Sequence, residues 1–275
     1  MVRAVQATLQ SDALDAAFKA EAISIPGESL IADRLTPVDP DAIHTSRETL
    51  RAAIGSQLRS ELLNVYGAGG AAGGDLSPEA KGIRRLRSVA LGLLASADPS
   101  HGAALAKAQF DGADNMTDRQ GALAVLVSLD APERQAALDA FYGRFHDNAL
   151  VIDKWFALQA VAQRPDTLEQ VKTLAGHPDF TIGNPNRLRA LVGTFAHNHW
   201  AFNRADGTGY AFVADMIIDA DKLNPQTAAR MVAPFGRWKQ LEPNRSRMMK
   251  AALERIAGAP GLSKDVFEQA SKSLA

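Results

Sequence analysis

The feature that most constrains the fold of this chain is a repeated helix start, in which a capping residue is followed directly by proline. It occurs at Ser77-Pro78, Asp98-Pro99, Asn184-Pro185 and Asn224-Pro225. The side chains of Ser, Asp and Asn accept hydrogen bonds from first-turn N–H groups, and proline loses nothing at a position whose N–H has no helical partner. We also expect Pro132, Pro165 and Pro243 to open helices.

Between these starts, Ala, Leu, Arg and Glu dominate the segments with helical apolar periodicity, and no segment alternates apolar and polar residues as a half-buried strand does. With about 11 to 12 residues per helix and short connections, 275 residues hold roughly fifteen helices. The prolines are unevenly spaced, and no tetratricopeptide, ankyrin or leucine-rich signature is present. We predict an all-α fold, an irregular α-solenoid of stacked antiparallel helices of the armadillo/HEAT type.

A glycine-rich segment from Gly67 to Gly74 interrupts this pattern after a helix that should end near Tyr66. So many glycines disfavour a helix, and we expect a flexible connector there. The preceding residues are too few and too polar for a separate hydrophobic core. We therefore predict a single domain over residues 1–275.

Charge and composition exclude several classes of partner. Thirty basic and 31 acidic residues give a net charge of −1, so a nucleic-acid partner is not expected. The chain has no cysteine, which rules out disulfides and thiolate ligands and suits a reducing compartment. No apolar run approaches the ~18 to 20 residues of a membrane span, and the start lacks a signal peptide. We expect a cytoplasmic protein with no membrane partner.

The common catalytic motifs are absent. No histidine begins a His-Glu-x-x-His zinc motif, and neither a Gly-x-Ser-x-Gly elbow nor a phosphate-binding loop occurs. His197-Asn198-His199 lacks further ligands nearby in the sequence, so we interpret these as surface histidines. The sequence therefore predicts no catalytic residue, no metal ligand and no cofactor in this chain.

Other charged and aromatic groups are interpreted as structural. Arg84-Arg85-x-Arg87 and Arg245-x-Arg247-x-x-Lys250 would place their side chains in different directions on helices, as solvated faces do. Asp153-Lys154-Trp155-Phe156 lies in an apolar segment, where the aromatic pair is expected to anchor the core.

Two helices carry more informative arginines. Arg187 and Arg189 are two positions apart, which separates them by roughly 200° around a helix, so only one can face a given cavity. Gln226 and Arg230 are four positions apart and share a face, where an amide and a guanidinium suit carbonyl or carboxylate recognition. On residue pattern alone, hydrogen bonding at helix ends and between helices remains the alternative for these groups.

Several motifs together resemble the C-terminal region of the bacterial aminopeptidase N family, zinc metallopeptidases of the thermolysin-like gluzincin group. In chain order they are Phe110-Asp111-x-Ala113-x-Asn115-Met116-Thr117-Asp118, Leu150-Val151-x-Asp153-Lys154-Trp155-Phe156-x-x-Gln159-Ala160, Asn184-Pro185-Asn186-Arg187-x-Arg189, Asp206-Gly207-x-Gly209-Tyr210 and Asn224-Pro225-Gln226. The resemblance continues to Leu274-Ala275, is looser over the first hundred or so residues, and departs from the family pattern around His197 to Trp200.

The resemblance implies a whole enzyme with an N-terminal β domain, a zinc-bearing catalytic domain and a β-sandwich, none of which this chain contains. It implies that the helical domain forms a superhelical bowl over the active site and borders the primed side of the substrate cavity. By the same resemblance, Arg189, Gln226 and Arg230 are expected to contact substrate, whereas Arg187 stays structural.

The resulting expectation is an accessory domain that limits access to a peptide active site and has no catalysis of its own. Its partners would be the catalytic domain of the same polypeptide and peptide substrates, and zinc would belong to that catalytic domain. The alternative is a free-standing helical-repeat scaffold for protein–protein interaction. A hydrolase built on these helices would need clustered catalytic groups, which the sequence does not contain.

Overall fold

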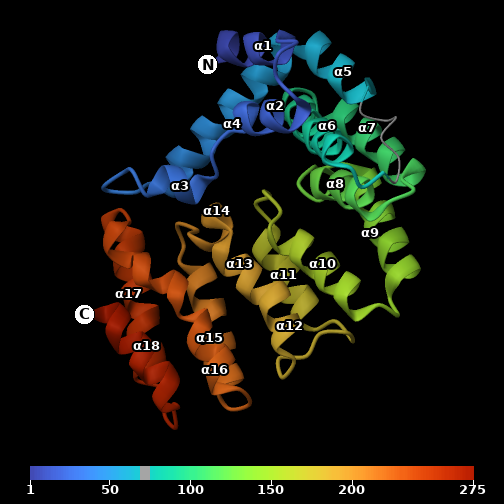
Figure 1. Cartoon of the computed structure of the whole chain (residues 1–275). Helices are drawn as coiled ribbons and strands as arrows, with labels where there is room; N and C mark the ends of the chain where they lie inside the picture. The colour runs from blue at the N-terminus through green and yellow to red at the C-terminus, as the bar shows by residue number, and fades with distance from the viewer. Residues whose placement is uncertain (69–74) are drawn as a thin grey trace. The chain divides into compact units, whose positions relative to one another are not determined.

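The computed structural model describes residues 1–68 and 75–275, which fold almost entirely as helices (Figure 1). Fifteen helical elements in these ranges have seven residues or more, and the described residues form no strand. The all-α prediction is confirmed. The predicted connector lies mostly outside the described residues. Its first two residues, Gly67 and Ala68, belong instead to the last turn of the preceding helix, which ends at Ala68, close to the predicted end near Tyr66. A single glycine in a last helical turn costs only about 1 kcal/mol, which is too little to end the helix.

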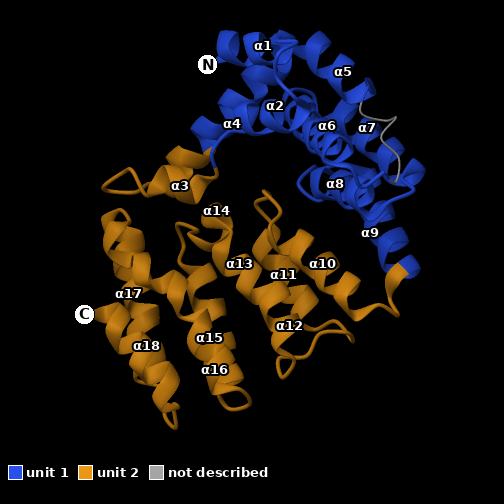
Figure 2. Ribbon diagram, viewed as in Figure 1, with its two compact units in different colours: residues 1–26, 45–144 blue, residues 27–44, 145–275 orange. Residues whose placement is uncertain are grey.

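The described residues divide into two compact units, residues 1–26 with 45–144 and residues 27–44 with 145–275 (Figure 2). The single domain over residues 1–275 therefore stays a prediction. The helices of the first unit are α1 (Val2–Gln10), α2 (Ala16–Ile23), most of α4 (Pro40–Gln57), α5 (Arg59–Ala68), α6 (Pro78–Ala97), α7 (Pro99–Gly112), α8 (Met116–Leu126) and α9 (Pro132–Phe145).

Helix α6 is the centre of the first unit, where it contacts α2, α5, α7 and α8. Its leucines Leu91 and Leu94 are fully buried. Glycines allow the neighbouring helices to approach closely: a Cβ on Gly55 of α4 would lie 2.1 Å from the carbonyl oxygen of Leu93. A Cβ on Gly102 of α7 would lie 2.4 Å from the Cα atom of Ala95. The small residues thus set the helix spacing in this unit.

The second unit contains α3 (Glu28–Ala32), the first turn of α4, and the helices that follow residue 145. These are α10 (Ala149–Ala160), α11 (Thr167–Ala175), α12 (Pro185–Leu188), the π-helical turn η2 (Arg189–Gly193), α13 (Thr194–His197), α14 (His199–Phe202), α15 (Thr208–Asp221), α16 (Pro225–Met231), the 3₁₀ segment η3 (Ala233–Gln240), α17 (Pro243–Ala257) and α18 (Lys264–Leu274).

Aromatic rings form the centre of the second unit. Phe202 meets Phe195, Tyr210 and Phe235 edge to face, with ring centroids 5.1 to 6.2 Å apart. All four side chains are almost fully buried. Burial raises the pKa of the Tyr210 phenol, whose hydroxyl donates a hydrogen bond of 2.8 Å to Asn203. The buried polar group is therefore satisfied within the aromatic cluster.

The four predicted helix starts are confirmed, because the side chains of Ser77, Asp98, Asn184 and Asn224 each accept a first-turn N–H. Pro132 and Pro243 also begin helices.

The prediction for Pro165 is wrong, since α11 begins at Thr167. Pro165 instead occupies the second position of a turn in which the Thr167 N–H donates to the Arg164 carbonyl over 3.2 Å. The fixed φ of proline suits that position as well as it suits a helix start.

Candidate functional site

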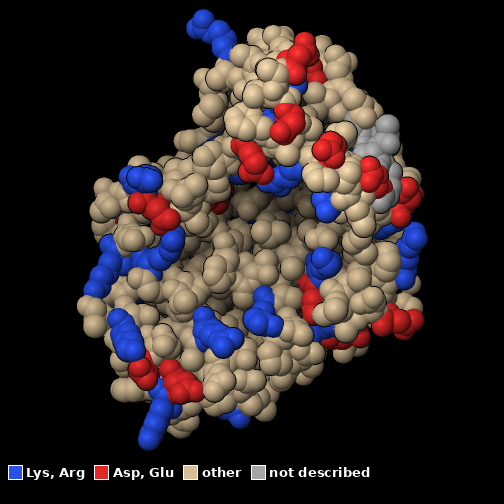
Figure 3. Space-filling model, viewed as in Figure 1, with Lys and Arg blue, Asp and Glu red and all other residues tan. Residues whose placement is uncertain are grey.

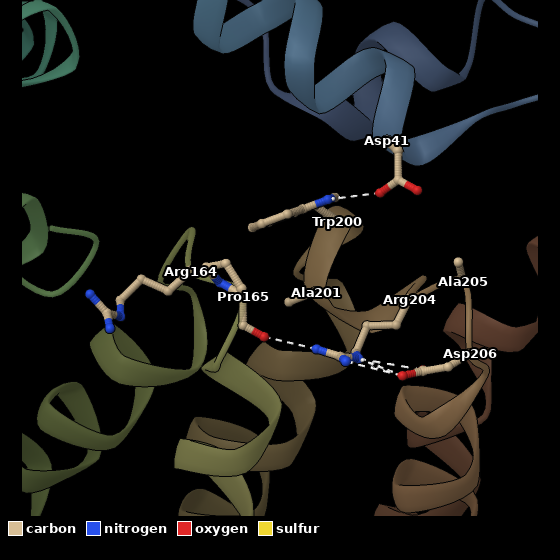
Figure 4. A pocket seen from close by; sticks show the side chains of 8 residues that line it. All are labelled: Asp41, Arg164, Pro165, Trp200, Ala201, Arg204, Ala205 and Asp206. Atoms are coloured by element: carbon tan, nitrogen blue, oxygen red, sulfur yellow. Dashed lines mark hydrogen bonds and ion pairs between the residues drawn. The ribbon is translucent and has the colours of Figure 1, made fainter. Parts of the chain in front are cut away.

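One pocket of the second unit lies beside Trp200 and has a volume of about 270 Å³ (Figure 4). The indole Nε1 of Trp200 donates to the Asp41 carboxylate over 3.0 Å. On the other side of the pocket, Arg204 bridges the carbonyl of Pro165 and the carboxylate of Asp206. The Arg204 guanidinium and the hydroxyl and N–H of Thr208 hold the pKa of Asp206 well below its usual range.

The charges around this pocket are satisfied by one another. Arg164 pairs with Asp166 at 2.8 Å, Asp206 pairs with Arg204, and Asp41 pairs with Arg245 of α17. Arg245 is itself buried and donates to the carbonyl of Asn203 over 2.6 Å. These contacts make the Trp200 pocket a structural junction of the second unit rather than a binding site for a charged ligand.

A buried carboxylate lies next to this junction. Glu28, at the start of α3, accepts a hydrogen bond from Nδ1 of His44 at 2.8 Å and lies 3.9 Å from Nδ1 of His199. The interpretation of His199 as a surface histidine is wrong, because only 8% of its side chain is exposed. His199 begins α14, and the side-chain oxygen of the preceding Asn198 caps this helix by accepting a hydrogen bond from the Ala201 N–H. Burial lowers the pKa of His199, and Glu28 acts in the opposite direction.

These groups do not form a metal site. In the ranges 1–68 and 75–275, no group of three or more His, Cys, Asp or Glu side chains is arranged to hold a metal ion. The described residues therefore do not fit the zinc site that the resemblance implies for a whole enzyme.

A second pocket, of about 410 Å³, brings together two of the three predicted substrate-contacting residues. Arg189 of η2 and Arg230 of α16 both line it, although they are far apart in the sequence. We call it the arginine pocket. Its remaining wall is formed by His197, Thr194, Thr227, Met231 and Pro234 together with Gly193 and Ala196.

Arg189 lies where the helix type changes. Helix α12 passes into the π-helical turn η2 at Arg189, and π turns are frequent at functional sites. The guanidinium Nη2 of Arg189 donates to the side-chain amide oxygen of Asn186 one turn earlier. Its carbonyl oxygen lies 3.3 Å from the hydroxyl of Thr194, which donates to it. Arg189 is exposed and forms no ion pair with a described residue.

Arg230 is the less restrained of the two. Within the described part of the chain, its exposed guanidinium makes no hydrogen bond and no ion pair. The pocket wall also contains no aspartate or glutamate. Two guanidinium groups therefore border one pocket with no carboxylate beside them, an arrangement that attracts anions.

Gln226 and Arg187 lie outside this pocket. Gln226 is exposed on the first turn of α16, and Thr227 rather than Gln226 joins Arg230 in the pocket wall. Arg187 is buried, pairs with Asp153 and donates to the carbonyls of Asp179 and Ala149 over 2.8 and 3.0 Å. Phe156 packs beneath its guanidinium, 5.3 Å from ring centroid to Cζ. These contacts agree with a structural role for Arg187 and for the Asp153-to-Phe156 motif.

His197 is the pocket residue that sequence reasoning missed. Its Nδ1 lies 2.8 Å from the carbonyl oxygen of Gly193, one helical turn earlier. No motif marks His197, because its place in the pocket depends on α16, which follows about thirty residues later in the chain.

No helix in residues 1–68 and 75–275 is long and apolar enough to span a bilayer. Acidic and basic side chains lie side by side over α17 and α18 on the face shown in Figure 3.

Comparison with known proteins places the chain in a family. The family described as "Domain of unknown function (DUF3458_C) ARM repeats" matches residues 1–275, which confirms the predicted armadillo type. Aminopeptidase N of Caulobacter vibrioides is 43% identical over 271 residues, which are 97% of this chain and 31% of that protein. Aminopeptidase N of Escherichia coli is 37% identical over 273 residues, 99% of this chain and 31% of that protein.

A solved structure agrees with these relatives. Aminopeptidase A of Legionella pneumophila, in complex with aspartic acid, superimposes with a TM-score of 0.91 at 31% identity. The match covers 99% of this chain and 33% of that one, so the chain spans about a third of the proteins that it resembles. The chain therefore belongs to the DUF3458_C family of ARM repeats, and it corresponds to the C-terminal domain of bacterial aminopeptidase N.

Proposed function

We propose that this chain caps the active-site cavity of a bacterial zinc aminopeptidase, limits the access of peptides, and binds the substrate beyond the cleaved bond. The release of amino-terminal residues takes place in the remainder of the longer polypeptide. The partners of the chain are the catalytic domain of the same polypeptide and peptide substrates. The proposed location is the cytoplasm, which suits a chain without cysteine.

The arginine pocket carries the substrate-contact part of this proposal. Arg189 and Arg230 border one pocket, neither has an acidic partner among the described residues, and both are exposed. A guanidinium offers several N–H donors in a planar fork that matches a carboxylate or a peptide carbonyl. Gln226 stays in the proposal as an exposed amide one helical turn before Arg230, although it does not line the pocket.

Substitution in the longer polypeptide tests the substrate contact. A charge-assisted hydrogen bond contributes roughly 1.5 to 3 kcal/mol, so Arg189→Ala or Arg230→Ala should lower kcat/KM for dipeptides and tripeptides by about 10- to 100-fold. Arg34→Ala is the matched control, because Arg34 is also exposed but lies outside the pocket. Unchanged kcat/KM in both pocket variants would refute the contact.

The access-limiting part needs a separate measurement. The longer polypeptide is compared with a version that lacks this domain, using a tripeptide and a peptide several times longer. If the domain limits access, its removal raises kcat/KM for the long peptide relative to the tripeptide, and adding the purified 275-residue chain in trans reverses the change. An unaltered ratio of the two values would contradict the capping role.

A further inference from the structure

We infer that His197 is a third recognition group of the arginine pocket, and that it makes the pocket selective for carboxylates in a pH-dependent way. This inference rests on the proposed substrate contact and adds to it a specificity-determining residue and a ligand class. The ligand is a carboxylate, supplied either by the C-terminus of a short peptide or by an acidic side chain.

The hydrogen bond to Gly193 defines which ring nitrogen of His197 is available. A carbonyl oxygen can only accept, so Nδ1, 2.8 Å away, carries the proton. In the neutral imidazole Nε2 is therefore an acceptor without a proton, and in the imidazolium it becomes a donor. The Gly193 contact fixes the ring within the pocket wall while it leaves Nε2 for a ligand.

The electrostatic surroundings of His197 favour an anionic ligand. The charged groups that line the pocket with it are Arg189 from η2 and Arg230 from α16, and its wall has no carboxylate. Helix α13 also contacts α10 and α14, whose titratable groups are Asp153, Lys154 and His199. Asp153 pairs with Arg187, His199 lies against Glu28, and none of the three lines the pocket. Because no residue that lines the pocket is acidic, a protonated His197 would be neutralised by a bound anion and not by the pocket wall.

The apolar part of the wall limits the kind of carboxylate that fits. Met231, Pro234 and Ala196 line the same pocket as the two arginines and His197, so the pocket offers apolar contact together with the positive charge of the arginines. A small free anion would use only the charges. A short peptide brings a carboxylate joined to an apolar side chain, which matches both parts of the wall.

The test measures binding of N-acetylated dipeptides to the whole 275-residue chain by NMR chemical-shift titration at pH 8 and pH 5.5. N-acetylation removes the amino group, which would otherwise titrate in this range. The three probes are N-acetyl-Ala-Ala with a free carboxylate, its C-terminal amide, and N-acetyl-Glu-Ala amide. Binding of the first alone identifies the C-terminal carboxylate as the ligand, and equal binding of the third admits acidic side chains.

We expect binding of the free acid to strengthen by about fivefold from pH 8 to pH 5.5, the gain from one added exposed ion pair. His197→Gln should keep the affinity at pH 8 and lose this gain. His146→Gln is the matched control, since His146 is exposed, belongs to the same unit and lies outside the pocket; it should keep the gain. Near-ultraviolet circular dichroism at both pH values shows that each variant is folded.

The outcomes separate the two levels of inference. If His197→Gln keeps the full pH-dependent gain while Arg189→Ala and Arg230→Ala lose binding, the role of His197 is wrong and the substrate contact of the arginines stands. If the arginine variants bind the free acid as wild type does, the substrate contact of the arginines fails and the role of His197 fails with it. If the acid and its amide bind equally, the pocket is not selective for carboxylates and the role of His197 fails, while a contact between the arginines and peptide carbonyls stands.

Discussion

The indole ring of Trp200 lies flat on the imidazole of His44, with ring centroids 3.8 Å apart and planes 1° from parallel. The stack joins α14 to the first turn of α4, two segments of the second unit that are far apart in the sequence. The same segment is held by Val38, whose N–H donates to Gln240 over 2.7 Å and whose carbonyl accepts from Glu242 over 2.9 Å. Residues 27–44 are therefore fixed to the second unit by stacking, backbone pairing and the buried Glu28 carboxylate.

Removal of the Trp200 ring should loosen this segment. Trp200→Ala loses the stack and the hydrogen bond to Asp41, and we expect the second unit to lose about 2 kcal/mol of stability. Trp200→Phe keeps an aromatic stack and should cost about 1 kcal/mol. Amide hydrogen exchange of residues 27–44 is the measurement, because it reports local opening.

Trp238→Phe is the control for this prediction. Trp238 belongs to the same unit and donates its indole N–H to the carbonyl of Ser273 over 2.9 Å. Its loss should leave exchange in residues 27–44 unchanged. Equal protection of those residues in Trp200→Ala and wild type would show that the stack does not hold the segment.

Acid should destabilise the second unit through His199. Burial lowers the pKa of its imidazole, and the Glu28 carboxylate opposes this without cancelling it. In the unfolded chain an imidazole titrates near pH 6.5. Between that pH and the lowered pKa of the folded state, the unfolded chain binds a proton at His199 that the folded chain does not bind. Stability therefore falls as the pH drops below about 6.5, by at most about 1.4 kcal/mol per pH unit for this group.

Urea unfolding between pH 8 and pH 5 checks the sign. His199→Phe removes the titrating group. Because the buried Nδ1 of His199 has no hydrogen-bond partner, the substitution leaves no partner of that atom unpaired. The variant should show a shallower loss of stability on acidification than wild type. Identical slopes for the two proteins would mean that His199 does not titrate differently on folding.

Two glycines of the first unit should respond in opposite ways to alanine. A Cβ on Gly102 would meet the backbone of α6, 2.4 Å from the Cα atom of Ala95, so Gly102→Ala must push α7 away and should cost about 2 kcal/mol. A Cβ on Gly143 of α9 has nothing within 4 Å, and Gly143→Ala should stabilise by about 0.5 to 1 kcal/mol through helix propensity. Thermal unfolding of both variants measures the difference, and equal effects of the same sign would contradict the close helix contact.

The helix starts were predictable because their information is local. Ser77, Asp98, Asn184 and Asn224 cap helices through contacts two or three residues away, and a capping residue followed by proline is sufficient to indicate them. Pro165 was misassigned because a proline in the second position of a turn and a proline at a helix start have the same local sequence pattern.

The arginine pocket was predictable only in part. The resemblance to a family indicated Arg189, Gln226 and Arg230. Gln226 lies four residues before Arg230 and Thr227 lies three residues before it, so the two flank Arg230 on opposite sides of the helix. Sequence spacing does not reveal which side faces η2, and the structure shows that it is the side of Thr227. The stack of His44 on Trp200 has no local signal, because its partners meet only through the tertiary fold.

The most direct test of the central claim is a double-mutant cycle between Arg230 and the substrate carboxylate in the longer polypeptide. The values of kcat/KM are measured for a tripeptide and its C-terminal amide, each with wild type and Arg230→Ala. A carboxylate held by Arg230 predicts a coupling of about 1.5 to 3 kcal/mol, because amidation then costs activity in wild type and almost none in the variant. A coupling near zero would show that Arg230 does not bind the carboxylate and would contradict the account.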